Sequence, residues 1–555
     1  MNNLQFPLFL SSAIPYVNAA PHVGHALELL IGDALARHQR QRGRHVHFTG
    51  GTDDHSLKNA RAAAALSVPT QQLVSEHGDT FRRLQASLGV ELDDYLHTSR
   101  DPRHAPAVTA LWQRCARAGD LYTKPYAGRY CTGCEAFLDE SELVAGSCPT
   151  HRESPEEVCE TNWFFRLSRY QEPLLRALTS GALRVEPRER QNEVESFVGG
   201  GLLDFSVSRS RERARNWGIG VPGDPSQVIY VWFDALANYL SLLGFPEQTP
   251  ELLRHWSQAP AAREHLIGKD ILRFHAVYWP AILLSAGLPL PSSIKVHGFV
   301  TLEGQKIGKS LGNAVDPFAL VERFGVSAVR YYFLRHLHTT LDSDFRVERL
   351  LEAHDSELAG KIGNLLQRVT ALALRHPSLA LRKGDAAPSD ADRALQDAAT
   401  RAVSDVRQAV DDFALQQALA SILELAAAAN RYADAQEPWT LSRRAKAAKT
   451  PAAAADLLAQ LAHVLWRLLE ALRITAILLA PFLPEAARSI ARRIGAPAAD
   501  LRDLARAHFG AGRSFSPCAG PPLFPRLQKT LLAAIPTAGL PEEYPKRATP
   551  AFELE

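Results

Sequence analysis

Apolar and polar residues follow two different patterns along this chain, and the change comes near residue 350. In the first part, apolar runs at 6–13 and 45–50 flank a stretch, 24–42, whose apolar residues recur at helical spacing. A strand, a helix and a strand in this order predict a βαβ unit of a parallel α/β sheet. Further elements of this part are expected as strands at 228–233, 265–268 and 295–302 and as a helix over 270–286.

The second part has a helical pattern. From Leu350 onward Ala and Leu dominate, and apolar residues recur three and four positions apart, as in Leu415, Leu419 and Ile422. This spacing predicts a bundle of amphipathic helices of about 150 residues, in which the apolar stripes pack together as a core. The tail after Gly510 is rich in Pro and is expected to run over the surface.

Length and charge narrow the classes of function. The chain has 555 residues, more than the ~250–300 at which a single core stops growing, so two or more domains are expected. Its 62 Lys and Arg against 60 Asp and Glu give a net charge of +2. That balance argues against binding nucleic acid with the whole surface, but it allows a local basic patch. No stretch is typical of a membrane span or an export signal, so we expect a cytoplasmic protein with reduced thiols and no membrane partner.

Four of the six Cys lie in one segment, and their spacing indicates a metal site. Cys131-Thr-Gly-Cys134 and Cys148-Pro-Thr-His151 are two short knuckles separated by thirteen residues. Tetrahedral Zn²⁺ takes four such sulfur and nitrogen ligands, so we predict one structural zinc ion per chain with no position open to water. Cys159 competes for the fourth ligand position, and four scattered buried residues are the alternative interpretation.

Two imidazoles flank a glycine between the first predicted strand and the first predicted helix, in Pro21-His22-Val-Gly24-His25. A helix N-terminus carries partial positive charge and unbonded N–H groups, so this turn favours a phosphate group. His22 and His25 could donate to phosphate oxygens as negative charge builds in a transition state, and Gly24 lets a ligand approach the backbone. An accidental His pair, or half of a metal site, is the alternative.

A second candidate loop follows the predicted strand at 295–302 and reads Gly304-Gln-Lys306-Ile-Gly308-Lys309-Ser310. Two Lys three positions apart among small residues suit a mobile loop that closes on a polyphosphate. The loop lacks the Gly-x4-Gly-Lys-Ser/Thr spacing of a Walker A motif, and a solvated Lys loop is the alternative.

Together the two loops resemble the HIGH and KMSKS signatures of class I aminoacyl-tRNA synthetases, and the residues around them are similar to the methionyl-tRNA synthetase family. The matching blocks follow the order of that family through nearly the whole chain. They are Ser12-Ala-Ile-Pro-Tyr-Val-Asn-Ala-Ala-Pro-His-Val-Gly-His25, Gly51-Thr-Asp-Asp-His55, Tyr230-Val-Trp-Phe-Asp-Ala235, Leu266-Ile-Gly-Lys-Asp-Ile271, Arg273-Phe-His-Ala-Val-Tyr-Trp-Pro280 and Lys309-Ser-Leu-Gly-Asn-Ala-Val-Asp-Pro317. The family activates methionine with ATP to methionyl-adenylate and pyrophosphate, and then transfers it to the terminal ribose of tRNA(Met).

The resemblance implies an α/β fold class, with a Rossmann-like parallel-sheet catalytic domain, an inserted zinc-knuckle domain and an α-helical bundle that binds the anticodon. The implied boundaries are 1–117 and 228–311 for the two halves of the catalytic domain, 118–227 for the insertion, 312–356 for a linking stem, 357–510 for the bundle and 511–555 for a C-terminal tail. No further domain follows the bundle, so a monomer is expected.

The resemblance also implies the residues of both substrate sites. For ATP, which enters with Mg²⁺, they are His22, Gly24, His25, Gly268, Asp270, Lys306, Lys309 and Ser310. The two His and two Lys of this set, with Arg209, are expected to be catalytic. For L-methionine they are the ammonium-binding Asp53 and a side-chain pocket of Ala13, Ile14, Tyr16, Trp232, Ala235, Leu236, Tyr239, Phe274 and His275. An aromatic slot suits a thioether, because sulfur–aromatic contacts contribute ~0.3–1.5 kcal/mol each; Ala235 and Leu236 are equally explained as core.

In the helical part, four residues resemble the anticodon-binding positions of the family: Asn364, Arg368, Pro438 and Trp439. Asn364 and Arg368 lie one helical turn apart, so both can face one nucleotide. Trp439 offers a stacking surface for a base, which is worth about 1–3 kcal/mol.

The chain departs from the family pattern at two places, so alternative functions have to be considered. Residues 306–310 read Lys-Ile-Gly-Lys-Ser, and Asp54 and Ser56 stand where Glu and Gly would be typical. These loops leave open a paralogue that adenylates an amino acid but acylates an acceptor other than tRNA. A synthetase for Leu, Ile, Val or Cys is disfavoured by the aromatic pocket and the lack of an editing-size insertion. A non-catalytic tRNA-binding protein is disfavoured by the intact His and Lys pairs.

Overall fold

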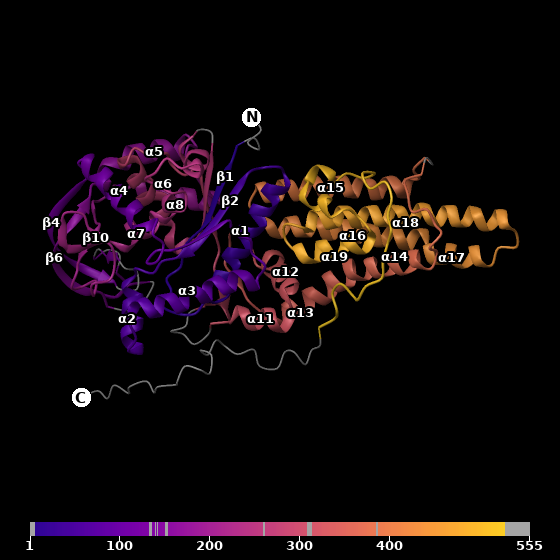
Figure 1. Ribbon diagram of the computed structural model, residues 1–555, viewed down its shortest axis with the longest axis horizontal. Coiled ribbons are helices and arrows are strands. Elements are labelled where there is room, and N and C mark those ends of the chain that lie inside the picture. The colour runs from indigo at the N-terminus through magenta and orange to yellow at the C-terminus, as the bar shows by residue number, and fades with distance from the viewer. Residues whose placement is uncertain are drawn as a thin grey trace.

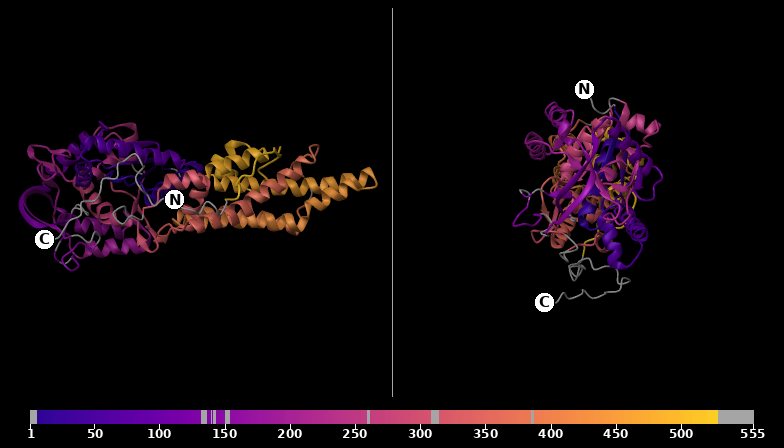
Figure 2. Two further views of the ribbon diagram at one scale, coloured as in Figure 1. Left: turned by 90° about the horizontal axis from the view of Figure 1, so that it is seen from below. Right: turned by 90° about the vertical axis from the view of Figure 1, so that its left-hand side faces the viewer.

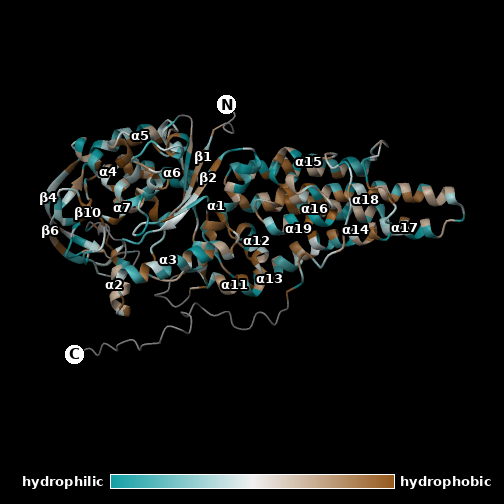
Figure 3. Cartoon of the chain, in the orientation of Figure 1, coloured by the Kyte–Doolittle hydropathy of each residue, from teal (hydrophilic) through white to brown (hydrophobic). Residues whose placement is uncertain are grey.

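A computed structural model describes residues 6–131, 136–138, 140, 143–149, 154–258, 261–307, 314–384 and 387–527. The molecule is elongated, with the α/β part at one end and a bundle of long helices at the other (Figure 1). The bundle remains extended away from the α/β part when the molecule is seen from below (Figure 2). The helices of the bundle alternate apolar and polar colours along their length, as amphipathic stripes require (Figure 3).

A six-stranded parallel sheet forms the centre of the α/β part, in the order β3-β2-β1-β12-β13-β7. Its strands are β1 (Leu8–Ser12), β2 (Val46–Thr52), β3 (Asp94–His97), β7 (Arg184–Glu186), β12 (Ala262–Gly268) and β13 (Ser293–His297). The chain leaves β1 toward one edge of the sheet and leaves β12 toward the other, although these two strands are neighbours. Such a switch point opens a crevice at the carboxyl ends of the strands, where ligands bind.

The strand–helix–strand unit predicted at the start of the chain is confirmed. Helix α1 (Val23–Gln41) joins β1 to β2, and it is buried along its apolar stripe. The other helices of this part are α2 (Leu57–Leu66), α3 (Thr70–Ser87), α4 (His104–Arg117), α5 (Gln171–Thr179), α6 (Arg188–Gly199), α7 (Val231–Leu236), α8 (Asn238–Ser241), α9 (Pro250–Leu252) and α10 (Trp279–Ser285).

Three of the expected elements are wrong in part. Strand β11 (Asp224–Ile229) ends early, and the apolar run that follows it forms α7, because a short buried apolar run does not distinguish strand from helix. The strand expected at 295–302 is two strands, β13 and β14 (Val300–Leu302), separated at Gly298. A Cβ on Gly298 would lie 2.1 Å from the carbonyl oxygen of Leu341, so the chain turns there against another backbone segment. The helix expected over 270–286 is a π-helical turn, Phe274–Tyr278, followed by α10.

An antiparallel sheet is inserted after α4 and interrupts the α/β pattern. Its order is β5-β4-β6-β8, and β4 (Leu121–Cys131) pairs with β6 (Glu156–Phe165) over nearly its whole length. The smaller strands of this region are β5 (Ala136–Leu138), β8 (Phe205–Ser206), β9 (Ser208–Ser210) and β10 (Gly220–Val221).

The C-terminal part is a helical bundle, as its apolar spacing predicts. Its helices and those that lead to it are α11 (Pro317–Phe324), α12 (Val326–His336), α13 (Val347–Ala353), α14 (Asn364–Leu374), α15 (Asp390–Asp411), α16 (Leu415–Gln436), α17 (Pro438–Lys446), α18 (Pro451–Leu479) and α19 (Pro484–Ile494). All residues of α18 from Val464 to Leu479 are buried, including the ion pair of Arg473 with Glu470, so this segment is the centre of the bundle. Over the part of the chain that the structure describes, no helix has the length and apolarity that crossing a bilayer requires. The α/β fold class with a parallel sheet, an insertion and a helical bundle is thus confirmed, whereas the zinc knuckle and the six residue ranges given above stay predictions.

One buried arginine joins the α/β part to the bundle. Arg330 of α12 donates to Asp33 Oδ2 of α1 at 2.6 Å and to the carbonyl oxygen of Phe482 at 2.7 Å. Gln41, at the end of α1, donates to the carbonyl oxygen of Ile477 at 2.7 Å. Because α1 begins beside the His-x-Gly-His turn, these bonds fix the helix that carries this turn against the bundle.

Candidate active site

A cavity of about 520 Å³ lies at the switch point of the sheet, beyond the carboxyl ends of β1 and β12. It brings together residues from the loops after β1, β12 and β13 and from α7. The residues predicted from the sequence that line it are Ala13, Ile14, Tyr16, His22, Gly24, His25, Trp232, Gly268 and Asp270. The cavity therefore lies where the topology of a parallel sheet places a ligand.

The two histidines of the first loop cap α1 with their own side chains. His22 Nδ1 accepts from the N–H of Gly24, and His25 Nδ1 accepts from the N–H of His22, both at 3.1 Å. In a neutral imidazole the nitrogen that does not accept is the donor, so each ring carries its proton on Nε2. The pair therefore replaces the Ser or Thr and the Glu of an ordinary capping box, and it sets both Nε2–H groups as donors at the positive end of a helix.

The glycine between these histidines is required by the packing of the turn. A Cβ on Gly24 would lie 2.9 Å from Cε1 of His22, closer than such atoms approach one another. The rings of His22 and His25 have their centroids 4.0 Å apart, so each ring restrains the other. A glycine at this position is what allows His22 to lie over the first turn of the helix.

Asp53 is buried beside the segment that follows β1 and pairs with Tyr16, which lines the cavity. It is 2% exposed, and its N–H donates to the carbonyl oxygen of Pro15 at 2.9 Å. Its Oδ1 accepts from the N–H of His55 at 3.2 Å, and Asn59 donates to its backbone carbonyl. The carboxylate is thus held by backbone contacts next to Tyr16, which pairs with it in a β-bridge.

Aromatic rings form one wall of the cavity. Trp232 stacks on Phe274 with ring centroids 3.8 Å apart and planes 4° from parallel. Tyr16 and His275 approach Trp232 edge-on at 6.2 and 6.1 Å. Of these rings, Tyr16 and Trp232 line the cavity and present a flat, polarisable surface of the kind to which a thioether binds well.

Behind this wall, His275 is held neutral. Its Nδ1 bonds to the carbonyl oxygen of Ile271 at 3.0 Å, which makes Nδ1 the donor, so Nε2 accepts from the hydroxyl of Tyr239 at 2.8 Å. Burial lowers the pKa of His275 to about 4. Several predicted pocket residues are not among those that line the cavity. Three of them are buried behind the lining: Ala235, Tyr239 and His275. Another, Phe274, stacks on the lining residue Trp232.

Arg209 lies apart from the main cavity. Its guanidinium donates to Ser206 Oγ at 2.9 Å and to the carbonyl oxygen of Ser208 at 2.7 Å, and it lies 4.4 Å from the ring centroid of Tyr230. It lines a smaller cavity of about 30 Å³ that His55 also lines. The structure therefore does not bring Arg209 together with the His pair, and its catalytic role stays a prediction.

Several predicted residues fall outside what the structure describes. Lys309, Ser310, Cys134 and His151 lie outside the described residues, and of Lys306 only the backbone is described, in β15 (Gln305–Lys306). Cys131 and Cys148, one from each predicted knuckle, are buried, at 2% and 1% exposure. Cys159, the competitor for the fourth ligand position, is exposed on β6.

Three charged residues of the cavity were missed by the sequence analysis. They are Glu28, Lys58 and His297. Oε2 of Glu28 is hydrogen-bonded to Nε2 of His297 at 3.1 Å. The Nζ atom of Lys58 lies 4.5 Å from the ring centroid of Tyr16. Burial raises the pKa of Glu28, and the facing His297 only partly opposes this. Two signals were available: Glu28 lies one helical turn after His25, and His297 ends a parallel strand.

In the bundle, the four residues predicted to contact the anticodon gather at the junction of α14 and α17. The guanidinium of Arg368 lies 4.6 Å from the ring centroid of Trp439 and donates to Asp434 at 3.1 Å. Asn364 is exposed at the start of α14, and Pro438 is the first residue of α17. The guanidinium thus packs against the half-exposed indole in a cation–π contact, and the role of these residues stays a prediction.

Known proteins resemble this chain over most of its length. A family model described as tRNA synthetases class I (M) matches residues 8–160 and 151–370, and one described as the anticodon binding domain of methionyl tRNA ligase matches 383–518. The methionine--tRNA ligase of Rhizobium meliloti (strain 1021) is 40% identical over 529 residues, which cover 94% of this chain and 98% of that protein. That of Brucella suis biovar 1 (strain 1330) is 39% identical over 501 residues, 90% and 93% of the two chains.

Solved structures agree with these relatives. Mycobacterium tuberculosis methionyl-tRNA synthetase in complex with methionyl-adenylate matches with a TM-score of 0.87 and 38% identity, over 94% of this chain and 100% of that one. Its apo form matches with a TM-score of 0.81 and 35% identity. The family resemblance inferred from the two loops and their flanking blocks is confirmed. This chain belongs to the class I aminoacyl-tRNA synthetases, in the family of methionine--tRNA ligases.

Proposed function

We propose that this chain activates L-methionine with MgATP and then transfers it to the terminal ribose of tRNA(Met). The observation that carries the proposal is the meeting, in one cavity, of two histidine N–H donors at a helix N-terminus with an aromatic wall on Trp232. A phosphate-binding end and a slot for an apolar side chain are what an aminoacyl-adenylate requires. We place the enzyme in the cytoplasm as a monomer.

In the first step, a methionine carboxylate oxygen attacks the α-phosphorus of ATP, and the bond to the pyrophosphate oxygen breaks. Phosphoryl transfer of this kind needs positioning and charge stabilisation rather than a protein nucleophile. His22 and His25 donate from Nε2 to the phosphate oxygens as their charge increases, and Lys306 and Lys309 supply positive charge from the second loop. Asp270, at the carboxyl end of β12, accepts from the ribose hydroxyls beside Gly268.

The methionine is oriented by its two ends. Asp53 binds the ammonium group, and its burial makes this interaction strong because little water competes for the charge. The thioether lies along the ring of Trp232, with Tyr16 at its edge. With both ends fixed, the carboxylate faces the phosphate site at the N-terminus of α1, which is the geometry that the attack requires.

Replacing Trp439 with Ala is expected to weaken tRNA charging without affecting the first step. Loss of the stacking surface removes about 1–3 kcal/mol, and therefore raises the KM for tRNA(Met) by about 5- to 150-fold. Methionine-dependent ATP–pyrophosphate exchange without tRNA should stay at the parental rate. The matched control is Trp112→Phe, which changes a buried Trp of the α/β part. An unchanged KM for tRNA in Trp439→Ala would remove this residue from the anticodon site.

We propose that Cys131, Cys134, Cys148 and His151 hold one structural Zn²⁺. The donor set fits, because three thiolates and one imidazole complete a tetrahedron and leave no open position. The two members described by the structure support this, since Cys131 and Cys148 are both buried, whereas the competing Cys159 is exposed. A bound zinc ion would stabilise the insertion and take no part in the reaction.

The zinc proposal predicts one equivalent of zinc per chain and its loss in Cys148→Ser. The variant should also unfold its insertion more readily, which limited proteolysis and thermal melting measure. Cys159→Ser is the matched control and should retain the metal. Full zinc content in Cys148→Ser would contradict the assigned ligand set.

The proposed activity is tested by ATP–pyrophosphate exchange with a panel of amino acids, followed by tRNA charging. Exchange that depends on methionine alone, with charging of tRNA(Met), is expected. Exchange with a different amino acid would refute the substrate. Exchange without charging of any tRNA would favour the paralogue that acylates another acceptor.

A further inference from the structure

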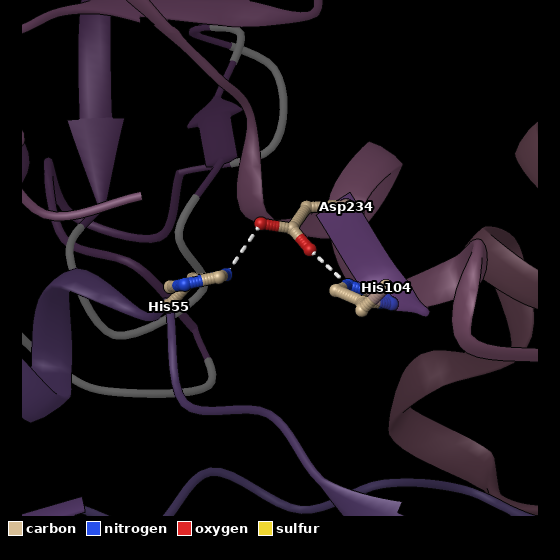
Figure 4. Close-up of side chains that lie close together, drawn as sticks. All are labelled: His55, His104 and Asp234. Carbon is tan, nitrogen blue, oxygen red and sulfur yellow. Dashed lines mark hydrogen bonds and ion pairs between the residues drawn. The ribbon is translucent and has the colours of Figure 1, made fainter. Parts of the chain in front are cut away.

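Two histidines and one aspartate form a buried cluster beside the methionine pocket. One oxygen of Asp234 lies 2.8 Å from His55 Nδ1, and the other lies 2.6 Å from His104 Nε2. Figure 4 shows the carboxylate between the two imidazoles, with one oxygen directed at each. His104 and Asp234 are 0% and 1% exposed, and no step of the proposed reaction uses any of the three.

These side chains have the identities of metal ligands, but their distances indicate hydrogen bonds. Bonds to zinc of about 2.0–2.1 Å keep neighbouring ligand atoms of a tetrahedron about 3.3–3.4 Å apart. Here the facing atoms are 2.6 and 2.8 Å apart, and each oxygen of Asp234 has its own imidazole donor. The second nitrogen of His104 is also engaged, with Ser241 Oγ at 3.0 Å. A proton, not a metal ion, therefore lies between each pair of atoms.

The cluster is ionic as well as hydrogen-bonded. Burial alone would lower the pKa of His55, but the charge of Asp234 and its hydrogen bond raise the pKa above the ordinary value. Burial alone would raise the pKa of Asp234, but His55 and His104 bring it well below its usual range. Removing the carboxylate would leave both imidazoles without the acceptor that holds them.

One end of this cluster holds the ammonium site. His55 follows Asp53 by two residues, and its own N–H donates to the Asp53 carboxylate at 3.2 Å. The ring of Trp217 packs edge-on against His55 with centroids 5.7 Å apart, which closes the far side. Because the ring of His55 is fixed by Asp234, the backbone donor that orients Asp53 is fixed too.

The other end holds the aromatic wall. Asp234 and Trp232 both lie on α7, a helix of one and a half turns with no side-chain cap. Within the described residues, the indole N–H of Trp232 has no hydrogen-bond partner, so packing alone holds the ring, by stacking on Phe274 and by edge-on contacts with Tyr16 and His275. Asp234, two residues after Trp232, ties α7 to His55 and His104 and so helps to set the rotation of this helix and with it the position of the indole.

We infer that His55, Asp234 and His104 are positioning residues for methionine, which hold the Asp53 carboxylate and the Trp232 ring at a fixed separation. The inference rests on the proposed function. The ammonium group and the thioether of methionine are joined by a chain of fixed length. The cluster therefore keeps the distance between Asp53 and Trp232 equal to the distance between these two ends of the substrate. A looser cluster lets one end move when the other is bound, and misplacement of this size weakens binding and slows the attack.

The test compares Asp234→Asn with the parent in ATP–pyrophosphate exchange. We expect the KM for methionine to rise at least about tenfold while the KM for ATP changes less than about twofold. The parent should also bind methionine far better than 4-(methylthio)butanoate, which lacks the ammonium group, and this ratio should shrink in the variant. Equal rises in both KM values, or an unchanged ratio, would overturn the inference in favour of a purely structural cluster.

Two further variants separate this role from a general loss of stability. His55→Asn keeps an amide N–H near the position of Nδ1 and should restore most of the affinity that His55→Leu loses. Asp392→Asn is the matched control, because Asp392 is also buried and bound to a histidine, His463 at 3.1 Å, but lies in the bundle. It should lower the melting temperature and leave the KM for methionine unchanged.

Two other outcomes would contradict different claims. Loss of a bound metal ion from His55→Leu would overturn the inference in favour of a metal site. A parent without exchange activity would refute the proposed function instead.

Discussion

Replacing His25 with Asn is expected to slow methionine-dependent ATP–pyrophosphate exchange by about 10²–10³-fold, the cost of removing one preorganised donor to a developing anion. The side-chain oxygen of Asn can still accept the N–H of His22, as Nδ1 of His25 does at 3.1 Å. The cap of α1 is therefore kept, while the Nε2–H donor is lost. The KM for methionine and the melting temperature should stay close to the parental values.

The control is a substitution with the opposite effect, which keeps the donor at Nε2 and loses the acceptor at Nδ1. In His25→Gln the amide nitrogen falls near the position of Nε2, so a donor remains but the acceptor for His22 is lost. This variant should lose less activity than His25→Asn and more stability, by about 0.5–2 kcal/mol, the cost of a helix cap. If His25→Asn retained the parental rate, or if both variants lost rate and stability in proportion, His25 would be a cap and nothing more.

The sequence identified the parts of this site that are local. The His-x-Gly-His turn could be predicted because its cap, its glycine and its donors all lie within four residues. The βαβ unit and the bundle could be predicted because apolar periodicity alone determines which face of each element is buried. The anticodon residues could be placed only through the family resemblance, since an Asn and an Arg one turn apart are usually a solvated helix face.

What the sequence could not show depends on contacts between distant segments. Glu28 of α1 faces His297 at the end of β13, and His55, in the loop after β2, faces Asp234 of α7. No periodicity encodes such pairs, because strand order decides them. Residues 228–233 were expected to be a strand, because a buried apolar run has no solvent-facing side to reveal its period. The turn of α7 that directs Asp234 inward was therefore not visible in the sequence.

Replacing Asp53 with Asn is expected to raise the KM for methionine by about 30-fold to several thousand-fold, with a much smaller effect on the KM for ATP. Losing one partner of a buried, hydrogen-bonded charge pair costs about 2–5 kcal/mol, and each 1.36 kcal/mol is a factor of ten. Asp53 is 2% exposed, so water cannot replace the lost charge. The Asn side chain has the same size and can still accept the N–H of His55, so the fold of this segment should be kept.

The neighbouring carboxylate provides the matched control for this prediction. Asp54 is also buried, but both of its carboxylate oxygens are already engaged by protein hydroxyls, those of Thr52 at 2.8 Å and Ser99 at 2.7 Å. Asp54→Asn should therefore lower the melting temperature and change the KM for methionine by less than about threefold, since it removes no contact to the ammonium group. Exchange kinetics over a range of methionine concentrations measure both variants. If Asp54→Asn raised the KM as much as Asp53→Asn, the effect would come from the stability of this loop, and Asp53 would not be the ammonium site.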